Sequence, residues 1–212
     1  MDDGVKIAIT ALVTTIGTAL VAVINHRMSE RKDRKSKEED RTTHAVYLAV
    51  RVVCVLDKFV AGCCEVIGDD GVYDPEGARH HEVEPPVLTL PDDVDWRSIR
   101  PELMYRVLML PNEIENAGNT IAFVGNMVAF PPDYDEWFDE RRYQYGKLGL
   151  YALDLASALR SAYDLPMADY SRWNPRPHLE AAFVREDAMR RLGAEAASQI
   201  AKGSGSKEET PQ

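Results

Sequence analysis

The stretch AVYLAVRVVCVLDKFVAGCCEVI, residues 45–67, decides the fold class. Its apolar residues recur at spacings of four and three, which is the period of one face of an α-helix. This seam consists of Ala45, Ala49, Val52, Leu56, Phe59, Cys63 and Val66, and a second row widens it: Val46, Val50, Val53, Val60, Cys64 and Ile67. Arg51, Lys58 and Glu65 form a narrow polar line opposite. A face this broad predicts a helix packed on at least two neighbours, ended by the glycines and aspartates of residues 68–71.

The residues before this helix are polar and predict a helical stalk. Residues 26–44 are rich in Glu, Lys and Arg, with opposite charges three or four positions apart, as in Glu30 with Arg34 and Asp33 with Lys37. Neither glycine nor proline occurs between Gly17 and Gly62, so the helix can continue unbroken into residues 45–67. A frayed linker near residues 41–43 is the alternative.

Further upstream, residues 7–24 (IAITALVTTIGTALVAVI) carry no charge. A helix of about 20 apolar residues spans a ~30 Å hydrocarbon layer, so residues 7–25 are predicted to form one transmembrane helix. The run is too long for the apolar region of a cleaved signal peptide and lacks a small-residue cleavage site. A buried core helix is a weaker alternative, because every face of the helix is apolar.

The charges beside this span indicate its orientation. Seven Lys and Arg side chains lie between Arg27 and Arg41, against Lys6 alone upstream, so the C-terminal part is expected in the cytoplasm. Residues 1–41 hold eight basic and seven acidic side chains (net +1), and residues 42–212 hold seventeen and twenty-eight (net −11). An acidic domain without a basic stripe argues against a nucleic-acid partner. Three cysteines, two of them adjacent, form no disulfide framework.

Residues 69–97 form a long acidic connection, called the acidic segment below. It holds nine acidic residues, two arginines and four prolines. A loop this long in a compact domain is either functional or disordered, and the sequence leaves both open.

Helices are expected again from Arg100 onward. Pro101 opens one, and Pro111 either kinks it or begins a second. Asp133 is expected to cap a longer helix that reaches about Tyr163, and Asn174 with Pro175 begins a last one. The sum is an all-α fold: a transmembrane helix that continues into a stalk, then a bundle of about four helices with one long acidic loop.

No catalytic, cofactor or metal site is predicted. His80, His81, Glu82 and Glu84 lack metal-ligand spacing, and the calcium-loop-like run at residues 69–77 places valines at two ligand positions. Cys63 and Cys64 lie on the apolar seam and are expected in the core. Carboxylates such as Asp133, Asp135, Glu136 and Glu140 could build a bundle metal site, but the Glu-x-x-His pattern of such sites is missing.

The run PPDYDEWFDERRYQYGKLG, residues 131–149, is dense in aromatic and charged side chains. Such a composition is typical of an interface hot spot, but we favour a structural role in which Arg141 and Arg142 pair with Asp135, Glu136 or Asp139. Together with LDKFVAGCCEVIGDDG and PELMYRVLMLPNEIENA, this run resembles a group of small bacterial or phage-associated proteins with an N-terminal anchor. The resemblance covers residues 56–149 and implies one recurring domain in a bacterial protein, but no activity, cofactor or site residue.

The sequence therefore predicts a single-pass protein of the bacterial inner (cytoplasmic) membrane. Its expected parts are an extracytoplasmic N-terminus (1–6), a transmembrane helix (7–25), a charged helical stalk (26–44), a helical cytoplasmic domain (45–202) and a disordered tail (203–212). We expect an interaction or scaffolding module rather than an enzyme, with the lipid bilayer and a protein partner or a homo-oligomer as partners. The alternative is a membrane-tethered enzyme or small-ligand binder with a site between the helices and the acidic segment. A phage lysis component with a periplasmic helical part conflicts with the charge bias.

Overall fold

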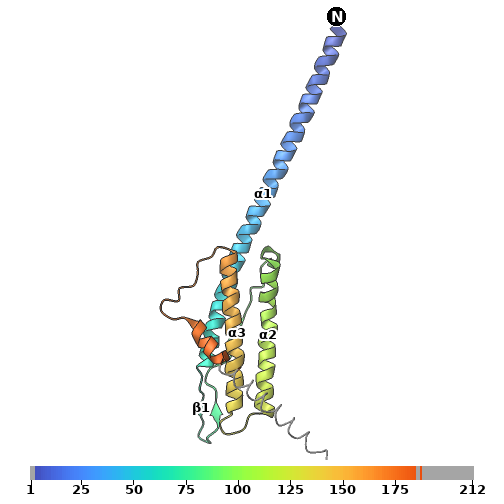
Figure 1. Cartoon of the computed structure of the whole chain (residues 1–212). Coiled ribbons are helices and arrows are strands. Elements are labelled where there is room, and N and C mark those ends of the chain that lie inside the picture. Colours follow the sequence, from blue (N-terminus) through green and yellow to red (C-terminus); the bar gives the residue numbers. More distant parts are fainter. Residues whose placement is uncertain (1–2, 185–186, 188–212) are drawn as a thin grey trace, which may run out of the picture. The chain divides into compact units, whose positions relative to one another are not determined.

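A computed structural model describes the backbone of residues 3–184 and 187, and the side chains of residues 27–29, 32, 35–184 and 187. Its elements, in chain order, are α1 (Asp3–Ile67), β1 (Val72–Tyr73), β2 (Arg79–His80), the 3₁₀ helix η1 (Trp96–Ser98), α2 (Pro101–Met127) and α3 (Asp135–Ala162) (Figure 1). Residues 175–184 are also helical. The chain divides into two compact units, Met1–Val46 and Tyr47–Gln212. The all-α class predicted from the sequence is confirmed.

In the first unit, α1 includes the predicted stalk, residues 26–44. The described charged side chains of the stalk are exposed, and Lys35 pairs with Glu39 at 3.7 Å. The hydroxyls of Thr42 and Thr43 donate to the carbonyls of Glu38 and Glu39 at 2.8 and 2.9 Å. The alternative of a frayed linker near residues 41–43 is therefore wrong, because the helix continues through these residues.

The predicted transmembrane span lies outside the residues whose side chains are described. Residues 7–25 belong to α1 by their backbone. Among the described residues, no helix is long and apolar enough to cross a membrane. The predicted span and its topology stay predictions, as does the disordered tail 203–212, which lies wholly outside the described part of the chain.

In the second unit, residues 47–67 of α1 bury the predicted seam. Ala49, Val52, Leu56, Phe59, Cys63 and Val66 are each at most 1% exposed. Four residues of the second row are buried as well, namely Val53, Val60, Cys64 and Ile67, whereas Val50 is 43% exposed. The exception shows that the apolar face is broader than the neighbouring helices can cover.

Helices α2 and α3 pack as an antiparallel hairpin. Trp137 at the start of α3 lies against Gly125 near the end of α2, and the Tyr151 hydroxyl donates to the Arg106 carbonyl at 3.3 Å. Pro111 lies inside α2, so no second helix begins there. Proline lacks the backbone N–H that would donate a helical hydrogen bond. Residues on both sides of Pro111, such as Val107 and Ala117, are buried, and their packing keeps the helix continuous.

Helix α3 also runs antiparallel to α1. Arg160 pairs with Asp57 at 2.5 Å, and Gly149 lies against Cys63. Residues 175–184 cover α3 at Gly149 through Leu179, and the Asn174 side chain accepts from the Arg176 amide at 3.0 Å, as the predicted cap requires. Helices α1 and α2 therefore run in the same direction, with α3 reversed.

The predicted capping role of Asp133 is wrong. The residue before α3 is Tyr134, which has a left-handed backbone (φ 52°) and caps no amide with its side chain. Asp133 instead accepts a hydrogen bond from the Tyr73 hydroxyl at 2.7 Å. The Asp133 carboxylate therefore contacts Tyr73 of the acidic segment and does not cap the first amides of α3.

The acidic segment is ordered and connects the end of α1 to the start of α2. It first forms an antiparallel hairpin of β1 and β2, in which Val72 faces His80 and Tyr73 faces Arg79. It then returns along α1, with Pro86 against Gly62 and Asp93 paired with Arg51 at 2.8 Å. Because α1 and α2 are parallel, the connection must travel back along the bundle, roughly 24 Å for the sixteen residues between positions 67 and 51. This requirement explains the length of the segment.

Candidate functional site

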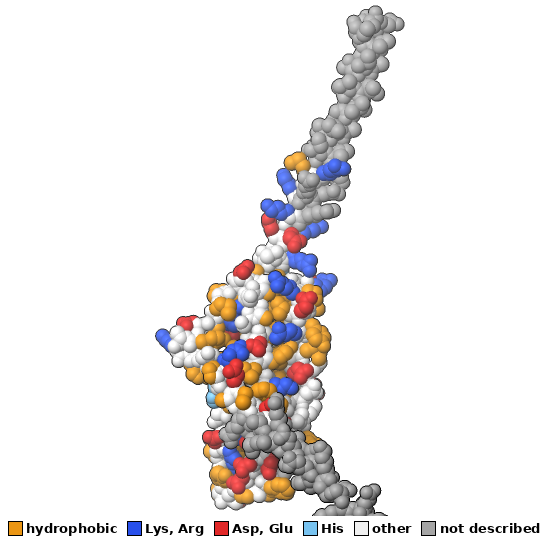
Figure 2. Space-filling model, in the orientation of Figure 1, with side chains coloured by type: hydrophobic (Ala, Val, Ile, Leu, Met, Phe, Trp, Pro, Cys, Tyr) orange, Lys and Arg blue, Asp and Glu red, His pale blue; other side chains and the backbone are white. Residues whose placement is uncertain are grey.

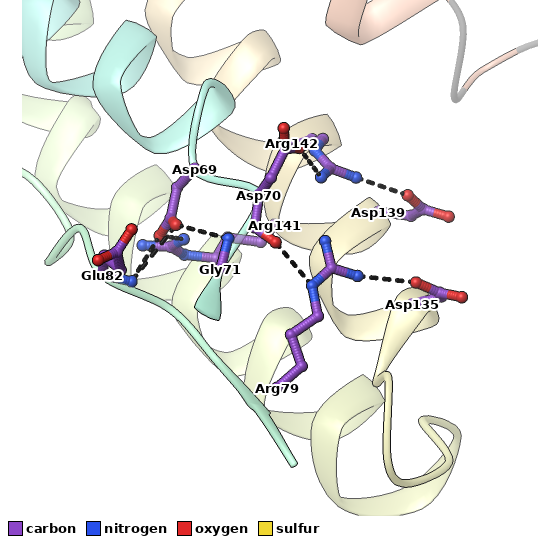
Figure 3. Close-up of polar contacts among 9 residues, drawn as sticks. All are labelled: Asp69, Asp70, Gly71, Arg79, Glu82, Asp135, Asp139, Arg141 and Arg142. Atoms are coloured by element: carbon purple, nitrogen blue, oxygen red, sulfur yellow. Dashed lines mark hydrogen bonds and ion pairs between the residues drawn. The ribbon is translucent and has the colours of Figure 1, made fainter. Parts of the chain in front are cut away.

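A buried ion pair anchors the acidic segment to α3. Asp69 follows the last turn of α1, and its carboxylate accepts from Arg141 at 2.7 Å while the two side chains are only 1% and 3% exposed. The same carboxylate accepts from the backbone amides of Gly71 and Glu82 at 2.9 and 3.1 Å (Figure 3). It also accepts from the amide of Val83 at 3.0 Å. Arg141 also donates to the Val83 carbonyl. The pair thus joins the residues on both sides of the β1–β2 hairpin to α3.

The environment of Asp69 suits a structural role. Burial alone would raise the pKa of this carboxyl, but the hydrogen bonds from Val83, Arg141, Gly71 and Glu82 outweigh burial and lower the pKa to about 2. A general acid or base works best with a pKa near the working pH. Asp69 remains ionised and fully hydrogen-bonded at neutral pH, so it holds the fold together rather than transferring protons.

Two further arginines tie the start of α3 to the hairpin. Arg79 donates to the Asp70 carbonyl at 2.7 Å and to Asp135 at 2.8 Å, and its guanidinium lies 3.8 Å from the centre of the Phe138 ring. Arg142 bridges Asp139 at 3.0 Å and Asp70 at 2.8 Å (Figure 3). The favoured structural role of residues 131–149 is confirmed, since Phe138, Arg141 and Tyr145 are buried. The Asp139 partner of Arg142 was predicted, but Asp69 was missed.

A pocket of about 390 Å³ lies beside this cluster, between the hairpin, the end of α2 and the start of α3. We call it the histidine pocket. Its lining consists of Arg79, His80, His81, Ala122, Gly125, Asn126, Tyr134 and Trp137. The lining contains no carboxylate, although the acidic segment holds nine. It therefore presents hydrogen-bond donors and aromatic rings to a ligand.

The rings of the histidine pocket are held in place by their neighbours. Trp137 touches Gly125 so closely that a Cβ there would lie 2.6 Å from the indole. His81 lies 5.4 Å from Trp137, and the Arg141 guanidinium lies 5.3 Å from the same ring. His80 is hydrogen-bonded to Asp74 at 2.7 Å. Arg79 uses two guanidinium nitrogens in the contacts above, which leaves its second terminal nitrogen without a partner among the described residues.

The residues weighed as metal ligands do not converge. Asp133 binds Tyr73, Asp135 binds Arg79, Glu136 accepts from the Phe130 amide at 3.4 Å and Glu140 accepts from Gln144 at 2.6 Å. His81 lies 3.7 Å from Glu84. Within the described part of the chain, no three His, Cys, Asp or Glu side chains could hold a metal ion together.

Cys63 and Cys64 lie in the core, as their positions on the apolar seam predicted. Cys63 is fully buried and Cys64 is 8% exposed. Burial raises the pKa of both thiols, that of Cys64 to about 11. Because the thiolate is the reactive form, neither is an activated nucleophile. Cys54 is exposed on α1.

An uncharged face on α2 was not predicted from the sequence. Seven exposed residues lie along the side of this helix that points away from the core, and we call them the α2 stripe: Tyr105, Leu108, Asn112, Asn116, Asn119, Phe123 and Met127. Tyr105, Phe123 and Met127 are 63%, 60% and 73% exposed. None of the seven is charged, although 28% of the chain is. Scanning each predicted helix for a face without charge would have found it.

Comparison with protein-family models, curated proteins and solved structures returns no match for this chain. The resemblance to small membrane-anchored proteins therefore stays a prediction. Two features of the described residues are candidates for a binding site: the α2 stripe and the histidine pocket.

Proposed function

We propose that this chain is a single-pass protein of the bacterial cytoplasmic membrane whose helical domain binds a protein in the cytoplasm. The uncharged run of residues 7–24 and the seven-to-one excess of Lys and Arg downstream support the anchor and its orientation. The net charge of −11 on residues 42–212 supports a domain that an anionic leaflet repels. The domain is therefore expected to face the cytoplasm without binding to the membrane surface.

The α2 stripe is the observation that carries the binding role. Protein interfaces are depleted of charge at their centres and enriched in aromatic residues and methionine. The stripe combines Tyr105, Phe123 and Met127 with three asparagines, all exposed. Figure 2 shows hydrophobic side chains on the surface of the helical domain, interspersed with charged ones. A helix face that remains exposed and uncharged in so charged a protein is best explained by a partner that covers it.

A photoreactive amino acid at position 123 tests this role in intact cells. The expected result is one dominant adduct with a defined partner chain, formed in stoichiometric yield. The matched control places the same amino acid at Lys58, which is exposed on the polar line of α1. Equal labelling from the two positions, or a smear without a defined adduct, contradicts the proposal. A C-terminal reporter that is active only in the cytoplasm tests the orientation, and a silent reporter would overturn it.

The histidine pocket supports a second candidate function, the binding of a small aromatic anion. Its polar side chains are Arg79, His80, His81 and Asn126, of which the first three also pair with Asp135, Asp74 and Glu84 outside the lining, and its flat surfaces come from Tyr134 and Trp137. A volume of about 390 Å³ falls in the range of small-molecule sites, roughly 300–1,000 Å³. This candidate places the ligand where the helices meet the acidic segment.

Titration with benzoate, adenosine monophosphate, adenosine and inorganic phosphate tests the pocket, with tryptophan fluorescence as the readout. An aromatic anion should give a saturable change that the neutral nucleoside and phosphate do not give. His81→Ala should abolish the change, and His178→Ala, a histidine outside this pocket, should leave it unaltered. If the four probes behave alike, the pocket does not select aromatic anions.

A further inference from the structure

The α2 stripe has the same chemistry when it is followed in either direction from its centre. Asn116 lies in the middle, with Asn112 and Asn119 on either side. Leu108 and Phe123 follow, at eight residues before and seven after the centre, and Tyr105 and Met127 end the stripe at eleven residues on each side. Successive members are separated by 3, 4, 4, 3, 4 and 4 positions, which keeps them on one side of a helix. The stripe thus has an apolar end, a polar amide centre and a second apolar end.

From this pattern we propose that the partner of the α2 stripe is a second copy of the same chain. The proposal rests on the binding role proposed above and names the occupant of that face. A two-fold contact requires a patch that is complementary to itself. The stripe meets this requirement whether the two α2 helices pair in parallel or antiparallel, because apolar residues face apolar residues and asparagines face asparagines in both arrangements.

Charge favours this face over the remainder of the domain. Two copies that each carry a net charge of −11 over residues 42–212 repel one another wherever carboxylates face each other. The seven residues of the stripe carry no charge, and the exposed Glu113 and Glu115 lie at its sides, so association there costs less than a contact in which carboxylates face each other directly. Asparagine side chains have both donor and acceptor groups, and each can pair with the asparagine of the other copy. Such polar layers fix the register of paired helices at some cost in affinity.

The dimensions of the stripe predict a weak dimer that needs the anchor. From residue 105 to residue 127 an α-helix rises about 33 Å, and a helix is about 10 Å wide. One copy therefore buries on the order of 300 Å², and the pair about 600 Å², below the roughly 1,200 Å² of a stable interface. Tethering both copies to one membrane raises their effective concentration and favours the contact. Association should accordingly be stronger in membranes than at low concentration in detergent.

Cysteine cross-linking of the full chain in its membrane tests the proposal. The background carries Cys54→Ser, because Cys54 is the exposed native thiol among three cysteines. Asn116→Cys should form a disulfide-linked dimer rapidly under mild oxidation, since position 116 faces itself in both arrangements. Lys58→Cys, equally exposed on α1, is the matched control. Equal rates of cross-linking at positions 116 and 58 would overturn the proposal.

Disulfide cross-linking also distinguishes parallel from antiparallel pairing of the two α2 helices. Parallel helices predict that Phe123→Cys cross-links to itself. Antiparallel helices predict that Phe123→Cys cross-links instead to Leu108→Cys when the two variants are expressed together. Either outcome supports the dimer, and failure of both pairs together with position 116 excludes it.

An added charge provides an independent test on folded protein. Asn116→Asp changes one atom and places two like charges face to face, so the dimer fraction measured by sedimentation at high protein concentration should fall at least tenfold. Asn174→Asp adds the same charge at a helix cap, where aspartate is equally suitable, and should leave the dimer fraction unchanged. Equal dimer fractions would overturn self-association. An adduct with a different protein at position 123 would then leave the binding role standing, whereas the absence of any adduct would remove both.

Discussion

Asp69 and Arg141 form an ion pair of 2.7 Å that is almost wholly shielded from solvent, although 72 residues separate them in the chain. The carboxylate belongs to the first residue of the acidic segment, two positions after α1 ends, and the guanidinium belongs to the second turn of α3. Through the amides of Glu82 and Val83, the same carboxylate holds the acidic segment against the bundle. The acidic segment and α3 are therefore coupled at one buried charge.

Removing that charge should be more costly than any surface substitution. Asp69→Asn keeps the shape of the side chain but leaves the Arg141 guanidinium buried without a counter-charge, so we expect a loss of about 3–5 kcal/mol in the free energy of unfolding. Urea denaturation followed by circular dichroism measures it. The control is Asp95→Asn, whose solvent-exposed pair with Arg97 should contribute little to stability. Similar losses for the two variants would show that the buried pair is not the anchor.

The same pair predicts a dependence of stability on acid. The pKa of Asp69 is about 2 in the folded protein against an ordinary value of 3.8, so the folded state binds the proton less readily than the unfolded state does. The stabilisation is complete above the unfolded value and is lost as the pH falls from about 5 to about 2, roughly 2 kcal/mol in all. The difference in unfolding free energy between the wild type and Asp69→Asn should therefore shrink by that amount over this range. A difference that is constant with pH would contradict the assignment.

Most of the helical framework could be predicted because its signals are local. The seam from Ala49 to Val66, the stop after Ile67, Pro101 at the start of α2 and the Asn174 cap all depend on residues within a few turns. Pro111 is the exception. Its local signal indicates a break, but burial of Val107, Leu110, Ala117 and Ile121 on the same helix outweighs that signal.

The ion-pair cluster and the histidine pocket could not be predicted, because their residues meet only through the fold. No spacing relates Asp69 to Arg141, or Arg79 to Asp135, which are 56 residues apart. The strands β1 and β2 are two residues long, too short for a periodic signal. The acidic segment also contacts Arg51 and Gly62, which are ordinary residues in the sequence of α1. The α2 stripe, in contrast, was readable from the sequence alone.

Two glycines on α2 should respond to alanine in opposite directions. At Gly125 a Cβ would lie 2.6 Å from the Trp137 ring, so Gly125→Ala should displace the indole and destabilise the domain by about 1–3 kcal/mol. At Gly118 a Cβ meets nothing within 4 Å, and Gly118→Ala should stabilise by up to about 1 kcal/mol through helix propensity. Thermal unfolding and the tryptophan emission spectrum measure both effects. Stabilisation by both substitutions would mean that Trp137 does not pack on Gly125.

Gly62 should control how closely the acidic segment follows α1. Its missing side chain leaves room for Pro86, and a Cβ at this position would lie 2.6 Å from the proline ring. Gly62→Ala gains helix propensity, up to about 1 kcal/mol, but pushes the returning chain away from the helix. We therefore expect little change in global stability, together with faster hydrogen exchange in residues 87–95 and a weaker contact between Arg51 and Asp93. Arg51→Ala removes that ion pair without adding bulk, and it should accelerate exchange only near residue 93. If Gly62→Ala leaves exchange unchanged over the whole segment, the segment is held by its two ends and not by its contact with α1.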